Sequence, residues 1–306
     1  MKKILALGAF LGLLSLSVQA GTVAYYEFNG TGLAPVGSTI TDSTGNHHGT
    51  VAGGDLEYGM DPLAGSYLRF DSNSVDRVEI AGAPDLVFHT DGAYTIEVVF
   101  RTRMLTSAVG ALVSKGADVS NPDSQWWLRY RDGARATGLI EGTDNTTEDS
   151  ATTASGIPLN DGNWHHVALV FNGTVSPKRL EIYLDGVLSG SDASVGTAGV
   201  VGGADSDPVV IGEFASLAVS RSFAGDIAAI RLSDTALAPA EFLQVLATYI
   251  ADVTPTNGAS FLPPTTVAGF VVHSPTIGVT PSGIQVKLNG TDISGQLTIT
   301  GSNAER

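Results

Sequence analysis

Aromatic and basic side chains share one face of a predicted strand, a combination that could bind an acidic sugar. Alternation along residues 126–131 places Trp127, Arg129 and Arg131 together on one face. Arg101 and Arg103 end an earlier strand with the same alternation. An indole ring stacks on sugar faces, and a guanidinium grips carboxylate or sulfate. These five residues predict an exposed groove for an acidic glycan. The alternative is a solvated sheet face with internal Arg–carboxylate pairs.

Oxygen-bearing residues in a short loop could hold calcium. Asp42 and Asn46 bound a tight loop of Ser, Thr and Gly, and Asp226 could complete a site from a strand distant in sequence. Calcium prefers such hard oxygen ligands. The alternative is an Asx-turn that satisfies its own backbone. Calcium is the only cofactor that the sequence predicts.

The sequence gives less support for a catalytic site than for a binding site. His165 and His166 are adjacent, so they point to opposite faces of a strand and cannot easily share a metal ion. A retaining glycosidase needs two carboxyl groups about 5–5.5 Å apart, and Glu97 and Glu181 are each alone on their strands. We therefore expect a non-catalytic glycan-binding or adhesion module. A structural or protein-binding sandwich, and a glycoside hydrolase or polysaccharide lyase, stay as alternatives.

Composition narrows the class of protein. The 306 residues carry a formal charge of −15, which argues against a nucleic-acid partner. The absence of Cys excludes disulfides, thiolate catalysis and Cys-ligated zinc. A hydrophobic share of 43% is enough for a packed core.

The first residues have the form of a secretory signal. Lys2 and Lys3 precede an apolar run, and small residues lead to Ala20. We therefore assign 1–20 to a signal peptide and expect a secreted, extracellular or cell-surface protein, with the periplasm as an alternative. The run is too short for a comfortable membrane span, so no span is expected in the mature chain.

Short period-two segments separated by Asx-Gly turns fill the chain as far as residue 232. Ten or more antiparallel strands predict an all-β fold, a two-sheet antiparallel jelly-roll sandwich, over residues 21–250. One helix is expected at 239–249, because Pro239 suits a first helical position and an apolar stripe follows it.

Composition changes after Ala251. Residues 251–264 are rich in Thr and Pro and predict a linker. Strands are expected at 284–288, before an Asn-Gly turn, and at 297–300. Residues 265–306 are fewer than the roughly 100 that an immunoglobulin-like sandwich needs. We read them as the start of a truncated immunoglobulin-like β module of a longer polypeptide with further domains.

Two motifs give the chain a family resemblance. DGNWHHVALVF at 161–171 is followed by LEIYLDG at 180–186. With weaker matches from residue 24 to residue 227, these make residues 22–250 resemble the laminin-G-like, concanavalin A-like lectin/glucanase jelly rolls of bacterial exported proteins. One departure is Ala228-Ala229, where the family often has acidic residues.

The resemblance implies a pair of sheets with one concave face, and partners that are glycans or cell-surface ligands. Fold alone does not decide among these functions. The resemblance also implies a packed, structural role for the signature residues, which are Trp164, His165, His166, Asp185 and Gly186.

Overall fold

The computed structural model describes residues 21–61, 64–71, 76–88, 91–116, 125–141, 148–192, 206–214, 221–243, 249–254, 269–273, 284, 286–288 and 291–300. The predicted signal peptide lies outside these residues. Contacts divide the chain into two units, Val18–Val245 and a second that includes Leu246–Arg306, and each is described by itself.

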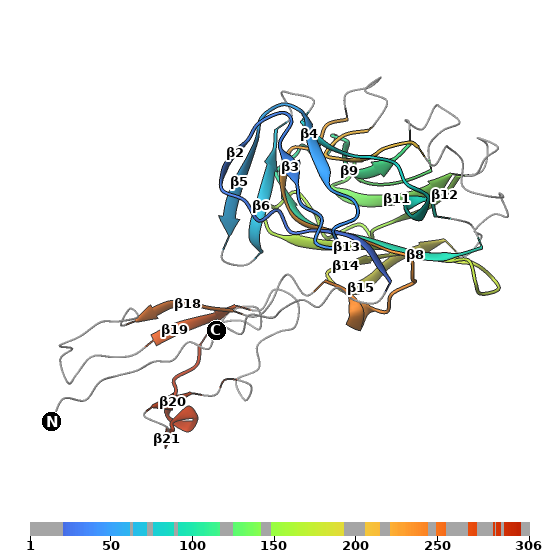
Figure 1. The fold of residues 1–306 in the computed structure, drawn as a ribbon. Helices are drawn as coiled ribbons and strands as arrows, with labels where there is room; N and C mark the ends of the chain where they lie inside the picture. The colour runs from blue at the N-terminus through green and yellow to red at the C-terminus, as the bar shows by residue number, and fades with distance from the viewer. Residues whose placement is uncertain are drawn as a thin grey trace. The chain divides into compact units, whose positions relative to one another are not determined.

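The first unit is built from two antiparallel sheets, which form the two layers in Figure 1. Sheet A has nine strands. Eight of them run in the order β15 (Val187–Asp192), β14 (Arg179–Leu184), β13 (His165–Asn172), β8 (Ala93–Thr102), β17 (Gly225–Ser233), β6 (Gly65–Phe70), β5 (Leu56–Asp61) and β2 (Gly32–Ala34). The ninth, β1 (Thr22–Tyr26), also pairs with β17.

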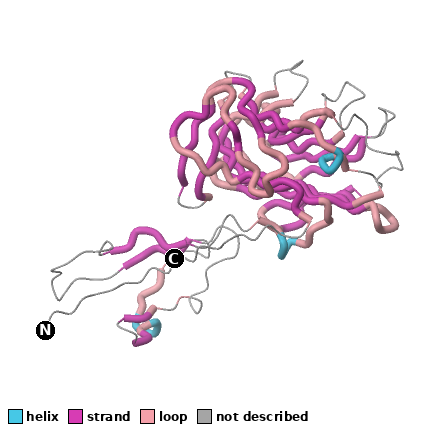
Figure 2. The backbone as a smooth tube through the Cα atoms, viewed as in Figure 1, coloured by secondary structure: helices cyan, strands magenta, loops and turns pink. Residues whose placement is uncertain are grey.

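Sheet B has eight strands, which lie over sheet A. Their order is β12 (Glu148–Thr152), β11 (Arg135–Glu141), β10 (Trp126–Arg131), β9 (Gly110–Lys115), β16 (Val209–Ile211), β7 (Arg77–Ile80), β4 (Gly49–Gly53) and β3 (Thr39–Ile40). Strands dominate the described chain, as the magenta tube in Figure 2 shows. The predicted all-β, two-sheet antiparallel jelly-roll sandwich is confirmed.

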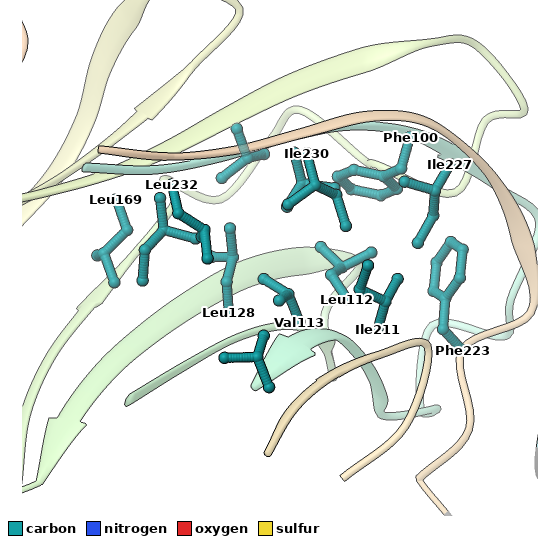
Figure 3. Packing of buried hydrophobic residues seen from close by; sticks show 14 of the residues in the cluster. Phe100, Leu112, Val113, Leu128, Leu169, Ile211, Phe223, Ile227, Ile230 and Leu232 are labelled. Carbon is teal, nitrogen blue, oxygen red and sulfur yellow. The ribbon is translucent and has the colours of Figure 1, made fainter. Parts of the chain in front are cut away.

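The core lies between the two sheets. Figure 3 shows Phe100 and Ile230 of sheet A facing Leu112 and Ile211 of sheet B, all of them fully or almost fully buried. On β8, every second residue from Ile96 to Phe100 belongs to this core cluster, because successive side chains of a strand point to opposite faces. The burial of this apolar area is the main force that holds the sheets together.

The outer face of sheet A is partly covered by residues 235–243, which we call the cover segment. Leu237 and Phe242 pack on Ala168 and Val170 of β13. The amide of Leu237 donates to Thr95 of β8 at 3.0 Å. The cover segment therefore closes over the middle of the sheet.

The prediction of a helix at 239–249 is wrong for the described residues of this range, 239–243 and 249. A short 3-10 helix, η2, spans Pro239–Glu241, and Phe242 is already extended. Tyr249 begins the strand β18 (Tyr249–Thr254). The apolar residues that suggested a helical stripe include Phe242, which packs on sheet A instead, so tertiary packing overrides the local pattern.

In the second unit, β18 pairs with β19 (Gly269–His273), and β20 (Lys287–Leu288) pairs with β21 (Thr291–Asp292). Residues 251–254, which we expected to begin the linker, therefore belong to a strand, and residues 255–264 lie outside the described part. Residues 297–300 follow the 3-10 helix η4 (Ser294–Gln296) and form no strand, contrary to expectation. The domain boundaries and the immunoglobulin-like assignment stay predictions.

The remaining short helix, η1 (Pro84–Leu86), lies in the first unit. Among the residues described, no helix has the length and apolar character needed to cross a membrane.

Candidate functional site

A pocket of about 700 Å³ opens where the central strands of sheet A end. Its walls come from the ends of β6 and β8, the loop after β8, the turn before β13 and the start of β17. We call it the arginine pocket. The lining residues that matter for its chemistry are Arg69, Arg101, Arg103, Leu105, Gly162 and Asp226.

Two of the arginines share one carboxylate. Asp226 accepts from Nε of Arg69 at 2.8 Å and from Nε of Arg101 at 2.7 Å. The strand register explains this, since Asp226 of β17 lies between Arg69 of β6 and Arg101 of β8. The hydrogen bond with Asp226 raises the pKa of the Arg69 guanidinium, so this group stays charged. The pair of arginines is thus fixed by a buried acid.

Aromatic rings hold Arg101 from beneath. Its guanidinium carbon lies 4.6 Å from the ring centroid of Trp164 and 5.0 Å from that of Tyr67. A cation over an aromatic face is attracted by the ring quadrupole. Arg101 also donates to Asp61 at 2.7 Å. Trp164, one of the signature residues, is buried here, and its ring supports the pocket wall.

The other signature residues shape the turns beside this wall. His165 places Nδ1 3.0 Å from Asp185 and Nε2 3.3 Å from Asp161. Asp185 also accepts from the backbone amide of His166 at 2.8 Å. Asp185 and Gly186 adopt φ of 50° and 79°, which suit the two-residue hairpin turn that their sequence predicts. The signature thus fixes the turn that carries Gly162.

The loop after β8 is held through its backbone carbonyls, which accept hydrogen bonds from other segments. Asn160 donates to the carbonyl of Met104 at 3.0 Å, and the Tyr130 hydroxyl donates to that of Leu105 at 3.1 Å. The amide of Gly133 donates to the carbonyl of Thr106 at 2.8 Å. Because the backbone of the loop is anchored at three successive residues, the protein's own contacts hold this wall of the pocket in place.

A second charged cluster lies on the same face of sheet A but is buried. Glu97 of β8 is 0% exposed and pairs with Arg231 of β17. His166 Nε2 lies 3.1 Å from the same carboxylate, and the amide of Leu243 donates to it at 2.7 Å. The cover segment shields this cluster, which we call the Glu97 cluster. His165 and His166 therefore point to different partners, as their adjacency predicts.

The five residues expected to share one exposed groove do not do so. Arg101 and Arg103 belong to sheet A and its following loop, whereas Trp127, Arg129 and Arg131 lie on sheet B. The expectation of one groove is wrong, because the two strands that carry these residues belong to different sheets.

Trp127 is also less accessible than expected. It is 1% exposed, packs against Phe214 edge-on at 6.1 Å, and lies 4.0 Å beneath the guanidinium of Arg129. Arg131 pairs with Asp132 at 2.6 Å. The residue that covers the indole, Phe214, lies far along the chain, and no local pattern pointed to it.

Asp42 and Asp226, two of the three predicted calcium ligands, are engaged by different partners, and Asn46 donates its backbone amide to Asp42. Asp42 accepts from the amides of Tyr25, Thr44, Asn46 and His47 at 2.7–3.1 Å. Burial opposes ionisation of Asp42, but hydrogen bonds led by that of Thr44 lower its pKa. This arrangement is the self-satisfied Asx-turn that was the alternative.

Asp226 is engaged by two arginines, as described above. Within the described part of the chain, no three His, Asp or Glu side chains gather as a metal site. Calcium binding at Asp42, Asn46 and Asp226 stays a prediction. A melting midpoint of the full chain measured in calcium and in EGTA tests it.

The sequence does not identify three of the lining residues, Arg69, Gly162 and Leu105, as parts of a site. Arg69 stands on the outward face of its strand, as alternation indicates, but its partner strand could not be read from the sequence. Gly162 belongs to the motif at 161–171, which by itself gives no binding role, and Leu105, which is 76% exposed, lies in a loop without a pattern. Only the pairing of β6, β8 and β17 brings these residues to one place.

Two solved structures with similar folds are binding domains of toxins or toxin-like proteins. The botulinum neurotoxin serotype G binding domain matches with a TM-score of 0.53 and 12% identity, over 72% of this chain and 49% of that chain. The binding domain of Paraclostridial Mosquitocidal Protein 1 matches at 0.52 and 13%, over 74% and 51%. The chain thus spans about half of the length of these two. At such identities the likeness concerns the fold.

A third structure is matched over almost its full length. Domain 4 of AbnA, a GH43 extracellular arabinanase from Geobacillus stearothermophilus solved in complex with arabinotriose, matches with a TM-score of 0.51 and 17% identity, over 74% of this chain and 98% of that chain. No curated protein matches the sequence.

The family is settled by a match of the sequence itself. The model of the concanavalin A-like lectin/glucanases superfamily, Laminin_G_3, matches residues 72–242. This range holds the motifs at 161–171 and 180–186 and most of the arginine pocket. Since the match covers more than half of the chain, the protein belongs to the concanavalin A-like lectin/glucanases superfamily.

Proposed function

We propose that the chain is a non-catalytic carbohydrate-binding module of an exported protein and that the arginine pocket is its binding site. The observation that carries this proposal is the pocket itself. It is a preformed cavity of about 700 Å³, large enough for a small ligand, with guanidinium donors beside an exposed leucine.

The lining suits a saccharide. Arg69 and Arg101 are oriented by Asp226, and their remaining N–H groups can donate to hydroxyl oxygens. Leu105 and Met104 offer apolar surface for the C–H face of a sugar ring. A few placed polar groups on an otherwise apolar wall are typical of ligand sites. The fold supports the same function, since a carbohydrate complex is known for the arabinanase domain of similar fold.

The acids of the pocket support binding rather than hydrolysis. A glycosidase needs one carboxyl group as acid and a second as nucleophile or base. Asp226 is the acid among the lining residues, and each of its oxygens already accepts from an arginine. Both oxygens of Asp226 are thus engaged in positioning the two arginines, which favours a binding role for this acid.

An array of plant, bacterial and animal glycans probed with the full chain tests the proposal. We expect binding to at least one glycan class, at least ten-fold weaker for Leu105→Ser, and no release of reducing ends on long incubation. Arg179→Gln removes an exposed arginine from β14 outside the pocket and is the matched control. An array without any bound glycan, or hydrolysis of a bound one, contradicts the proposal.

A further inference from the structure

The three arginines of the pocket differ in how their charge is balanced. Asp226 lies between Arg69 and Arg101. Arg69 has a second acid, Glu57, at 3.7 Å, and Arg101 has Asp61 at 2.7 Å. Two arginines thus face three carboxylates, so this side of the pocket carries no surplus positive charge.

Arg103 lacks such neutralisation. Its side chain is exposed, and within the described residues it has neither a hydrogen bond nor an ion pair. It nevertheless has a defined place over the turn before β13. A Cβ added to Gly162 would lie 2.4 Å from the guanidinium carbon of Arg103. The guanidinium therefore packs against the backbone of Gly162, at the place that a side chain would occupy.

The backbone behind Arg103 fixes its position further. The amide of Gly162 donates to the carbonyl of Thr102 at 3.1 Å, which ties the turn to the end of β8. Thr102 in turn accepts from the amide of Met104 at 3.0 Å. Both neighbours of Arg103 are thus held, and its charge is presented at the pocket wall without an internal acid.

We infer that Arg103 binds one anionic group of the ligand, a carboxylate or a sulfate, while the balanced Arg69–Asp226–Arg101 group binds hydroxyls. The inference rests on the proposed function and names its ligand as an acidic saccharide. A guanidinium forms two parallel hydrogen bonds with either anion. If a neutral sugar ring covered Arg103, the charged guanidinium would lose water and gain no opposite charge in exchange, which costs free energy. A single surplus charge predicts that the part of the ligand in the pocket carries one anionic group.

Matched pairs of polysaccharides test the inference by titration of the full chain. The first pair is polygalacturonate and its carboxyl-reduced form, and the second is dextran sulfate and dextran. For at least one pair, we expect the charged member to bind at least ten-fold more tightly than the neutral one. The Arg103→Gln variant should lose this preference, Arg103→Lys should keep part of it, and Arg179→Gln should keep all of it.

A second variant separates position from charge. Gly162→Ala keeps all three arginines but places a methyl group where the Arg103 guanidinium lies, so it should reduce the preference for the charged member. Thermal unfolding of each variant establishes that it is folded, because Gly162 has a φ of +83° and alanine there is strained.

The outcomes distinguish the inference from the proposed function. If neutral members bind as tightly as charged ones, and Leu105→Ser weakens both, the pocket binds glycans but the inference is overturned. A preference for the charged member that survives in Arg103→Gln also overturns it. If no polysaccharide of either pair binds and no glycan of the array binds, the proposed function is contradicted, and the inference that rests on it is contradicted as well.

Discussion

The same two strands carry two ion pairs of opposite polarity. On β8, Glu97 and Arg101 point to the outer face of sheet A, and on β17 their register partners are Arg231 and Asp226. At one end the acid is on β8 and the arginine on β17, and at the other end this order is reversed. The two pairs have the same residue types but different surroundings.

Their surroundings differ because only one pair is covered. Phe242 and Leu243 of the cover segment close over the Glu97 cluster, where the carboxylate also meets His166 and the Leu243 amide. The Arg101–Asp226 pair lines an open cavity with Arg69 and Arg103. In the proposed function, the covered pair serves the fold and the open pair serves binding. Four predictions test this difference.

Glu97→Gln should have the largest effect on stability. It leaves Arg231 beneath the cover segment without its anion, and breaking a buried pair in this way costs about 3–5 kcal/mol of the free energy of unfolding. Urea unfolding of the full chain, followed through the jelly roll's tryptophan fluorescence, measures it. A loss below about 1 kcal/mol, the range of exposed pairs, contradicts a structural role.

Asp226→Asn should cost less stability than Glu97→Gln. Arg69 is 48% exposed and Arg101 26%, so water can solvate both guanidiniums once the acid is neutral. A loss of about 1 kcal/mol is expected, because solvated ion pairs contribute little. The same unfolding experiment measures it, and equal losses for the two variants would remove the distinction between the regions.

The free energy of unfolding should depend on pH through His165, which contacts Asp161 and Asp185 in the turns beside the pocket. Burial alone would lower the pKa of His165, but its hydrogen bond with Asp185 and the charges of Asp185 and Asp161 raise it above 6.5. A raised pKa means that the folded state binds the proton more tightly than the unfolded state. This stabilisation is complete below about pH 6.5 and is lost as the pH rises through the folded-state pKa.

Stability curves of the full chain and of His165→Gln, measured from pH 5 to pH 9, test this sign. The difference between the two proteins should be largest in the acidic part of that range and should shrink toward the basic part. A difference that grows with pH contradicts the assignment of His165 to an acidic pair.

Arg103→Gln should have the smallest effect on stability and a large effect on binding. The side chain is exposed and has no ion pair to lose in the described chain, so the free energy of unfolding should change by no more than about 0.5 kcal/mol. Unfolding in urea measures this. A large destabilisation would show that Arg103 serves the fold, as Glu97 does.

The fold was readable from the sequence because its signals are local. Alternation placed Phe100 in the core and Arg101 outside it, and Asp185-Gly186 gave a hairpin turn. The predicted helix failed where Phe242, an apolar residue in a helical pattern, was used to cover an outer sheet face. Local periodicity does not say which distant surface an apolar side chain meets.

The candidate site was only partly readable. Arg101 and Arg103 were identified as ligand-binding candidates, but they were joined to Trp127, which packs on the other sheet. The sequence suggests a calcium site for Asp226, whereas its actual neighbours, Arg69 and Arg101, are set by strand order. Pairing between strands far apart in sequence decides which side chains meet, and a single sequence does not show that pairing.

A crystal structure of the full chain with its best-bound saccharide tests the central claim most directly. The account predicts that the sugar occupies the arginine pocket, with an anionic oxygen within hydrogen-bond distance of Arg103 and a ring face against Leu105. A sugar bound instead over the outer face of sheet B, beside Arg129, would contradict it.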